Sequence, residues 1–353
     1  MNRCLSAKIA ESLREELAAG RYRAGEELPS VAALGNRFGA GEYAVRHALR
    51  RLRDEGLLKL KSHIGSIVAP TLSRAWKGHV ALVHTSRRSA YFVSRLSIVL
   101  GEHFEAAGWC YHPVFTATAR DGIIDTSSIE RHVANGLDFA IVYSEFRQIA
   151  ELFDRAGVPY IVLNGFARDF PNARGIVRED FRPAFQSLVA ALKAHGVRTV
   201  LDFDFGRRMD RTFKSLLFQA GMEPHMAFSE WDNERPHRLG EIKALGRRAV
   251  SAYLSDPRNR ARLPDAILFN DDYFAAGGVV ALLEAGLKIP DDIRVISFSN
   301  CGDEPPLGAS VARVENDPDT YGATVATYVL KLLAGKRAAP PRIAYRFIPG
   351  GSL

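Results

Sequence analysis

A regular alternation of short apolar runs and amphipathic stretches fills most of the chain and constrains its fold more than any other feature. The apolar runs have the length of strands and lie at 79–84, 111–115, 139–143, 160–163, 198–203, 266–270 and 293–298. The amphipathic stretches have helical periodicity and lie near 92–107, 146–156, 181–195, 209–220, 239–255, 272–285 and 317–334. Strands that alternate with helices imply parallel sheets covered on both faces, which is an α/β architecture. So many strands fit two doubly wound lobes better than one, and ligands of such sheets bind at the carboxyl ends of the strands.

Length and composition favour a large protein of two domains. The chain has 353 residues, of which 47% are hydrophobic, so sizeable cores can form. No apolar run approaches the roughly 18 residues that cross a bilayer, and the charged N-terminus lacks the pattern of a signal peptide. We therefore expect a cytoplasmic protein with no membrane partner.

Cysteine, histidine and acidic residues give no pattern of a metal site. The three cysteines, Cys4, Cys110 and Cys301, are widely spaced, which argues against a disulfide framework and a zinc motif. None of the ten histidines shows ligand spacing. Asp202 and Asp204 have no His or Cys cluster nearby, so we interpret them as loop residues. The sequence predicts no metal and no cofactor.

The first 70 residues follow a different pattern, that of three short helices and a hairpin. Leucine and isoleucine recur every four positions in the first helix, at Leu5, Ile9, Leu13 and Leu17, and Gly20 ends it. Ser30 is expected to be the N-cap of a second helix that Gly39 ends, and a third begins near Gly41. Strands at 57–61 and 66–69, joined by a turn at 62–65, would form a wing.

The third of these helices has the layout of a recognition helix. Its inward side carries Val45, Ala48, Leu49 and Leu52. Its outward side carries Tyr43, Arg46, His47, Arg50 and Arg53. Residues 1–70 contain twelve Lys and Arg against eight Asp and Glu, so more than half of the formal net charge of +7 lies there. Such a head would bind DNA with strong salt dependence, although a solvated charged face is the alternative.

These residues resemble a known family. The segments G-R-Y-x-x-G-E-x-L-P-S at 20–30, R-F-G at 37–39 and V-R-x-A-L at 45–49 are similar to the winged helix-turn-helix head of GntR-family bacterial regulators. The resemblance implies a homodimer that places two recognition helices in successive major grooves of a near-palindromic operator. Taken with position on the head, it gives these candidates for DNA contact: Ser30, Arg37, Tyr43, Arg46, His47, Arg50, Lys61 and His63.

Three segments depart from the GntR pattern. The family usually has Glu-Arg after the serine at position 30, where this chain has Val31-Ala32, and Ser-Arg-x-Thr where this chain has 41–44. The second departure replaces an arginine by Glu42, a carboxylate that phosphate repels. The wing tip, usually G-x-G, is 63–65, His-Ile-Gly.

The rest of the chain resembles the effector domain of LacI-type repressors, which is similar to type I periplasmic sugar-binding proteins. The resemblance rests on 158–164, 175–180, 195–203 and above all 264–300, with its P-D-A-x-x-x-N-D and G-x-x-x-P-x-D-I-x-V-x-x-F segments. A GntR head on such a domain is the layout of the arabinose-repressor subgroup. We predict a DNA-binding domain at 1–70, a linker at 71–77 and an effector domain at 78–353. Lobe 1 is placed at about 78–177 and 306–336, and lobe 2 at about 178–305 and 337–353.

The resemblance implies a transcriptional regulator, a repressor, whose DNA affinity is controlled by a small molecule between the lobes, such as a sugar or a sugar derivative. The implied effector-binding residues are Tyr91, Phe92, Asn164, Asp180, Arg208, Arg211, Asn270, Asp271 and Asn300. The family's F-D-D or F-D-N becomes Phe-Ser-Asn at 298–300, which loses a carboxylate and argues against a standard hexose. Two alternatives stay open: Asp271 and Asp272 could simply begin a helix, and Tyr91 and Phe92 could be core aromatics.

Two other classes of protein fit the sequence less well. A catalytic α/β domain fused to a DNA-binding head would be expected to show an enzymatic motif, and we find no G-x-S-x-G, P-loop, G-x-G-x-x-G after a strand, or H-E-x-x-H. A fused aminotransferase should also show a lysine in the setting of a Schiff base. A ligand carrier without DNA binding would be exported, and no export signal is found.

Overall fold

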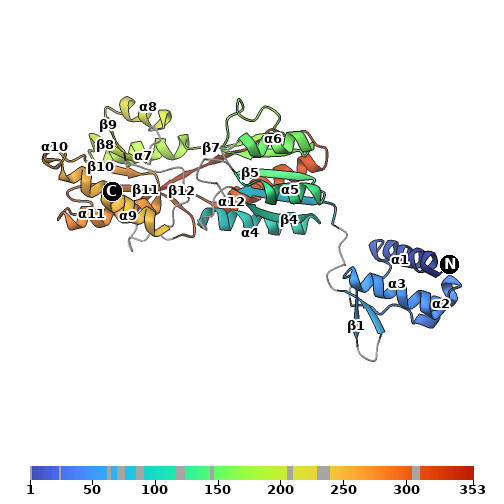
Figure 1. Ribbon diagram of the computed structural model, residues 1–353. Helices are drawn as coiled ribbons and strands as arrows, with labels where there is room; N and C mark the ends of the chain where they lie inside the picture. The colour runs from blue at the N-terminus through green and yellow to red at the C-terminus, as the bar shows by residue number, and fades with distance from the viewer. Residues whose placement is uncertain are drawn as a thin grey trace. The chain divides into compact units, whose positions relative to one another are not determined.

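The computed structural model describes residues 2–23, 25–61, 65–69, 76–84, 91–116, 124–143, 147–204, 210–228, 239–303 and 311–353. The chain divides into two compact units, Met1–Lys77 and Gly78–Leu353. Figure 1 shows the first unit, with the N-terminus, in the blue part of the colour scale, and the second unit runs from light blue to red. No helix in the described parts of the chain combines the length and the apolar character that a bilayer crossing requires.

The first unit consists of three helices and a two-stranded sheet. They are α1 (Asn2–Ala18), α2 (Val31–Phe38), α3 (Glu42–Asp54), β1 (Leu58–Lys61) and β2 (Gly65–Val68), with the two strands antiparallel. The inward sides of the helices share one core, which includes Ile9, Leu13, Leu34, Val45 and Leu52. Ser30 caps α2 by accepting a hydrogen bond from the amide of Ala33, and Gly39 ends that helix in the left-handed conformation at φ 58°.

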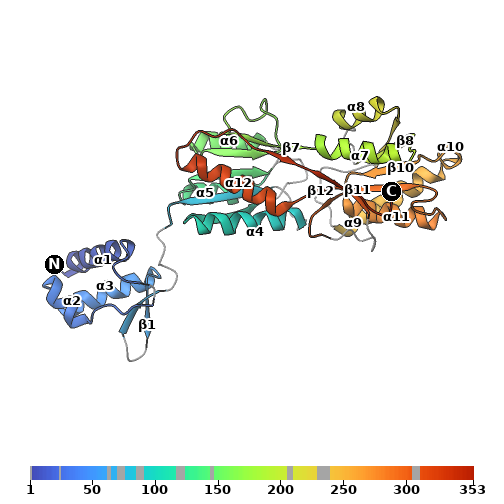
Figure 2. The same cartoon turned by 180° about the vertical axis from the view of Figure 1, so that it is seen from behind.

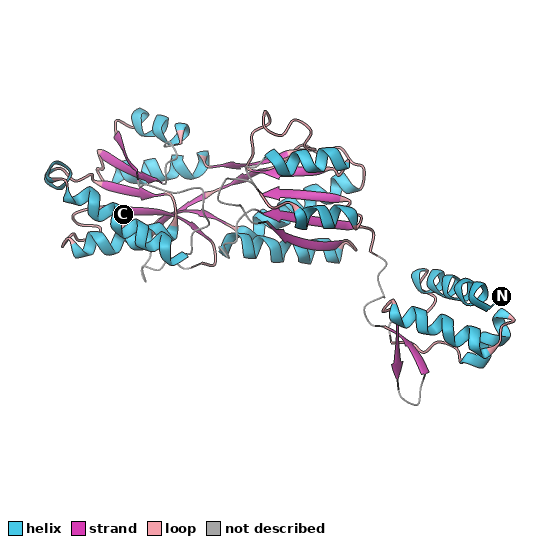
Figure 3. Ribbon diagram, in the orientation of Figure 1, coloured by secondary structure: helices cyan, strands magenta, loops and turns pink. Residues whose placement is uncertain are grey.

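The second unit contains two six-stranded sheets, each covered by helices on both faces (Figure 3). The first sheet has the order β13-β7-β6-β5-β3-β4, with β3 (His79–His84), β4 (Cys110–Phe115), β5 (Phe139–Tyr143), β6 (Tyr160–Leu163), β7 (Ile176–Asp180) and β13 (Arg342–Ala344). The second has the order β14-β12-β11-β10-β8-β9, with β8 (Thr199–Asp204), β9 (Glu223–Phe228), β10 (Ala266–Phe269), β11 (Arg294–Asn300), β12 (Ala312–Asn316) and β14 (Arg346–Ile348). All neighbouring strands are parallel except β12 and β14. The predicted α/β fold with two parallel-sheet lobes is confirmed.

Four apolar layers hold the helices against these sheets. On the first sheet, α4 (Tyr91–Ala106) and α12 (Pro318–Leu333) cover one face and lie side by side (Figure 2), while α5 (Ser127–Ala134) and α6 (Arg147–Ala156) cover the other. On the second, α7 (Arg182–Ala194) and α8 (Arg211–Gln219) cover one face, and α9 (Leu239–Ser255) and α11 (Asp272–Glu284) cover the other. A short α10 (Pro257–Ala261) follows α9.

The helices α9 and α11 approach each other at glycines. A Cβ atom at Gly277 would overlap the carbonyl oxygen of Lys243, and one at Gly246 would overlap that of Phe274. The absence of side chains at these two positions therefore permits the close packing of the pair.

The chain passes between the two lobes three times, each time through a single residue. Phe181 links β7 to α7, Asp317 links β12 to α12, and Tyr345 links β13 to β14. The rings of Phe181 and Tyr345 lie 4.4 Å apart, and the Tyr345 amide donates to the Asp180 carbonyl at 3.1 Å. Two of the three connections are thus packed against each other.

Because of these crossings, two strands lie in a different lobe from the one expected from the sequence. We assigned 306–336 to lobe 1 as a whole, but β12 belongs to the sheet of the second lobe. We assigned 337–353 to lobe 2, but β13 pairs with β7 in the first sheet. The reason is that the chain changes lobe at Asp317 and again at Tyr345, inside the segments that the sequence analysis treated as continuous.

Candidate functional site

The outward side of α3 presents a polar surface made of side chains that the sequence analysis selected. Tyr43 is 71% exposed, and its ring lies 6.4 Å from that of His47. The side chain of Arg46 is 65% exposed and pairs with Glu42 at 3.1 Å, one turn earlier on the helix. Arg50 is also exposed. Because the opposite side of α3 is buried in the core of the head, this face is held outward.

The other candidates for DNA contact have different surroundings. Arg37 pairs with Glu16, whose side chain is 10% exposed, and lies 4.9 Å from the Phe38 ring centre, so it ties α2 to α1. The hydrogen bond from Arg37 lowers the pKa of Glu16 below its ordinary value. Ser30 caps α2. Lys61 is the last residue of β1, its side chain is not described, and His63 lies outside the described residues.

In the second lobe, acidic and amide side chains gather at the carboxyl ends of the strands. Asn270 follows β10 and donates to the carboxylate of Asp202 at 2.5 Å. Asp271 caps α11 by accepting from the amide of Phe274 at 2.8 Å, so the alternative that it begins a helix is observed, beside the prediction that it contacts the effector. The hydroxyl of Tyr273 contacts Asp303 at 3.3 Å. This edge of the sheet is therefore rich in hydrogen-bond acceptors.

Asp272 lies buried next to this edge and is 8% exposed. Burial, together with the smaller effects of the neighbouring carboxylates of Asp271 and Asp303, raises the pKa of Asp272 to about 7. Near neutral pH the site therefore contains a carboxyl group that can gain or lose a proton when its surroundings change.

In the first lobe, the corresponding edge carries a second hydrogen-bonded group. Asn164, held at φ 64°, donates to Glu179 at 2.6 Å, and the Tyr345 hydroxyl donates to the same carboxylate at 3.0 Å. Asp180 accepts from the amide of Arg182 at 3.1 Å, where β7 ends. The rings of His84 and Tyr143, the last residues of β3 and β5, stack 5.0 Å apart at this edge.

Tyr91 and Phe92, the two aromatic residues predicted to bind the effector, have different surroundings. Tyr91 begins α4, and a Cβ atom at Gly302 would overlap its hydroxyl oxygen, so Tyr91 reaches from the first lobe to the turn after β11 of the second. Phe92 is 9% exposed and packs against Tyr143 and Tyr321 in the core. Tyr91 thus lies at the meeting of the two edges, whereas Phe92 is a core residue.

The remaining candidates are less closely grouped. Asn300 ends β11, and its carbonyl accepts from the amide of Asp303 at 3.1 Å. Arg211 is exposed at the start of α8. Arg208 lies outside the described residues.

Several polar residues of these edges were not predicted from the sequence. Asp202 was interpreted as a loop residue, which is wrong, because it lies within β8 and is 2% exposed. An acidic residue inside the apolar run 198–203 was the available signal. The others are Glu179, Tyr273, Asp303, His84 and Tyr143, of which His84 and Tyr143 end predicted strands.

The described residues also contain a group that could hold a metal ion, which the sequence analysis did not predict. It consists of His79, Cys110 and His112, whose ligand atoms all lie within 4.8 Å of one another. His79 and Cys110 begin β3 and β4, so the group lies at the amino ends of strands and not at the carboxyl-end site.

Comparison with family models supports the division into two parts. Residues 5–68 match the model of bacterial regulatory proteins of the gntR family, and residues 189–353 match the model of the periplasmic binding protein-like domain. The HTH-type transcriptional repressor PurR of Escherichia coli O139:H28 is 28% identical over 98 residues. That alignment spans 28% of this chain and 28% of PurR.

Solved structures extend the likeness to both lobes. The LacI family transcriptional regulator from Arthrobacter sp. FB24, solved in complex with lactose, is 20% identical with a TM-score of 0.61, covering 78% of this chain and 98% of that chain. The lac repressor dimer bound to operator and the anti-inducer ONPF is 15% identical with a TM-score of 0.64, covering 80% of this chain and 96% of that chain. The chain therefore joins an N-terminal helix-turn-helix domain of the GntR type to a periplasmic-binding-protein-like domain with the fold of LacI-family regulators.

Proposed function

We propose that the protein is a ligand-responsive transcriptional repressor that binds operator DNA as a homodimer. The observation that carries the proposal is the union, in one chain, of a GntR-type head that presents Arg46 outward on α3 and a two-lobed domain with polar side chains at its carboxyl-end edges. The described relatives are repressors and regulators, and none is described as an enzyme, which favours regulation over a catalytic α/β domain. A cytoplasmic location follows from this role, because operator DNA is found there.

The ligand we propose is a small polyhydroxyl or amine-bearing molecule held between the carboxyl-end edges. Carboxylate and amide oxygens of Asp202, Asn270 and Glu179 accept hydrogen bonds from such groups. The lactose complex of the Arthrobacter regulator supports a sugar-like chemistry. Ser299 in place of the family's aspartate argues for a ligand that differs from a standard hexose.

Ligand binding would change DNA affinity through the geometry of the dimer. A ligand shifts an equilibrium only as far as it prefers one conformation over the other. A coupling free energy of about 1–3 kcal/mol would change operator affinity roughly 5- to 150-fold.

The DNA-binding part of the proposal is tested by Arg46→Ala. We expect this change to weaken binding to a duplex selected from a random pool by about tenfold or more, since a contact to base or phosphate is worth about 1–3 kcal/mol. Glu42→Gln should have the opposite effect, because it frees Arg46 from its ion pair and removes a charge that phosphate repels. Both affinities are measured by gel-shift titration at fixed salt.

The matched control is Arg51→Ala. Arg51 is an exposed arginine on the same helix that pairs with Glu55 at 3.2 Å. It follows Arg46 by five positions, which places it about 140° away around the axis of an α-helix. We expect its replacement to change affinity by less than about threefold. Equal losses in the Arg46 and Arg51 variants would contradict a specific role for the outward face of α3.

A further inference from the structure

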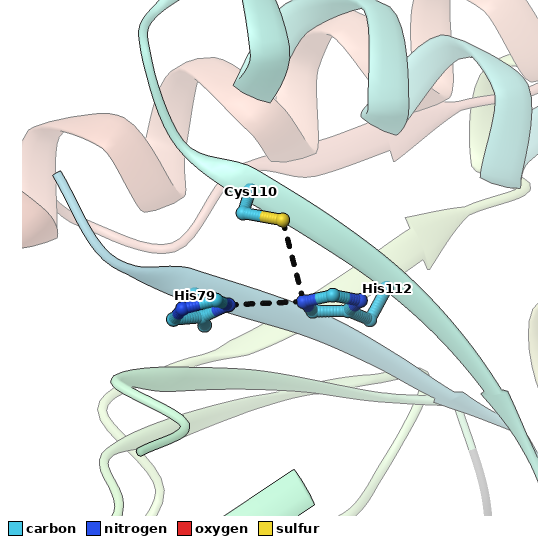
Figure 4. A group of neighbouring side chains, drawn as sticks. All are labelled: His79, Cys110 and His112. Carbon is cyan, nitrogen blue, oxygen red and sulfur yellow. Dashed lines mark hydrogen bonds between the residues drawn. The ribbon is translucent and has the colours of Figure 1, made fainter. Parts of the chain in front are cut away.

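Three metal-ligating side chains converge at the amino ends of β3 and β4, on the first sheet of the second unit (Figure 4). The Nδ1 atom of His79 lies 3.0 Å from the Nε2 atom of His112, and the Sγ atom of Cys110 lies 3.4 Å from the same Nε2. All three side chains are half-buried. The cluster is separate from the polar edges proposed to bind the effector, since it lies at the opposite ends of the strands.

The register of the two strands produces this convergence. His79 pairs with Cys110 in the parallel ladder, and His112 follows Cys110 by two positions, so all three side chains point to the same face of the sheet. Alternate residues further along the strands, Ala81 and Val114, pack on that face against α5 and α6. The ligand atoms are therefore fixed by two hydrogen-bonded strands and not by a loop.

The distances between the ligand atoms fit a tetrahedral shell. With bonds of about 2.0–2.1 Å to nitrogen and about 2.3 Å to sulfur, tetrahedral zinc separates two nitrogen ligands by about 3.3 Å and a nitrogen from a sulfur by about 3.6 Å. The observed separations of 3.0 and 3.4 Å differ from these by a few tenths of an ångström. The remaining pair, His79 and Cys110, lies within 4.8 Å and needs at most a small rotation of one side chain.

The surroundings of His112 favour its neutral imidazole, the form that binds metals. The pKa of His112 lies below its ordinary value, mainly because of burial and also because His132 and His79 are close. His132, on α5, has its ring 5.1 Å from that of His112. The backbone amide of His79 donates to Asp138 at 2.7 Å, which anchors the first residue of β3.

We propose that His79, Cys110 and His112 form a binding site for a transition-metal ion of the zinc class, with solvent at the fourth position. A set of two imidazole nitrogens and one thiolate binds zinc in preference to the hard cations magnesium and calcium, which favour oxygen ligands. Binding breaks the S–H bond of Cys110, forms the bond from sulfur to metal and releases one proton to solvent, with no change of oxidation state. Burial raises the pKa of the Cys110 thiol, so this proton is present before the metal binds.

The first test measures metal binding by the full chain after treatment with a chelator. We expect one equivalent of Zn²⁺ to bind, and Co²⁺ to give the visible bands of a tetrahedral site together with a thiolate-to-cobalt charge-transfer band. Cys110→Ser should abolish the charge-transfer band and lower zinc affinity at least about 100-fold, and His112→Ala should lower it similarly. The matched controls are Cys301→Ser and His225→Ala, which replace a half-buried cysteine and an exposed histidine elsewhere in the second unit.

The second test uses only the unaltered protein, so it does not depend on how the variants fold. Zinc should protect Cys110 from alkylation by iodoacetamide, measured by mass spectrometry of its peptide, while the peptide of Cys301 reacts as it does without metal. Absence of stoichiometric binding, equal binding by the Cys110 and Cys301 variants, or alkylation of Cys110 at an unchanged rate would each overturn the proposal. None of these outcomes depends on the DNA or on the effector, so they are independent of the proposed function.

Discussion

The carboxyl group of Asp272 begins α11 beside two other acidic side chains, and this position gives it an unusual titration. Its pKa rises from 3.8 to about 7, first through burial and then through Asp271 and Asp303. Between these two values the folded protein binds more protons than the unfolded chain does. The free energy of unfolding should therefore decrease as the pH rises through this window.

Asp272→Asn tests this titration. The wild-type melting temperature should fall between about pH 5 and about pH 8, and the variant should lose much less, because the amide does not ionise. At the upper pH the free energy of unfolding of the variant should exceed that of the wild type by at most about 4 kcal/mol, since each pKa unit corresponds to about 1.4 kcal/mol. Asp291→Asn, at an exposed position, is the control. Parallel pH profiles for the wild type and the Asp272 variant would contradict the raised pKa.

Asp271 has two separable roles in our account, since it caps α11 and is proposed to contact the effector. Asp271→Ser retains a capping oxygen but removes the carboxylate, whereas Asp271→Ala removes both. We expect the alanine variant to lose about 1 kcal/mol of stability and the serine variant to lose little. Both should lose the response of DNA binding to the effector. If the serine variant kept the full response in a gel-shift titration, Asp271 would be a helix cap only.

At the scale of elements, the packing of α9 against α11 depends on two glycines. Gly277→Ala would place a methyl group against the backbone carbonyl of Lys243, which cannot move without displacing α9. We expect a loss of about 1–3 kcal/mol, the usual cost of overpacking, measured by urea unfolding. Gly240→Ala, in the same pair of helices but with open space around the added methyl, should be neutral or slightly stabilising. Equal losses of stability at the two positions would mean that close packing of the helices does not explain the need for glycine at position 277.

The elements that the sequence predicted are those with a strong periodic pattern. The runs that became β3, β5, β6, β10 and most of β11 are continuous and apolar, because both faces of their sheets are covered. The strands β7, β9, β12, β13 and β14 were not predicted. They are short or contain charged residues or proline, and β9, β13 and β14 lie at sheet edges, where one side needs no partner.

The residues of the candidate sites likewise divide into those that a local sequence pattern predicts and those whose grouping depends on the fold. Asn270 and Asp271 were predicted because they directly follow a strand, and Arg46 because helical periodicity fixes its side of α3. The contact of Asn270 with Asp202 joins residues 68 positions apart, so the sequence could not show it without the order of strands in the sheet. The grouping of His79 with Cys110 and His112 likewise depends on strand register, which sequence spacing does not contain.

At the scale of the whole molecule, the proposed ligand site and the proposed DNA-contact face belong to different compact units. A ligand should therefore raise the melting temperature of the second unit and leave that of the first unchanged. We expect this shift from at least one member of a panel of monosaccharides, disaccharides and amino sugars. At about 100 times its Kd a ligand contributes about 2.7 kcal/mol, which corresponds to a shift of about 5 °C for a unit of this size. Calorimetry of the full chain measures both transitions, and a shift confined to the head would contradict the proposed site.

The three single-residue passages at Phe181, Asp317 and Tyr345 have a consequence for how the second unit can be taken apart. Each lobe is completed by strands or helices that arrive from the other, so neither corresponds to one uninterrupted stretch of chain. A protease that cut only at Phe181 would leave both halves tethered through the other two passages. Separate release of one lobe requires all three peptide linkages to be broken.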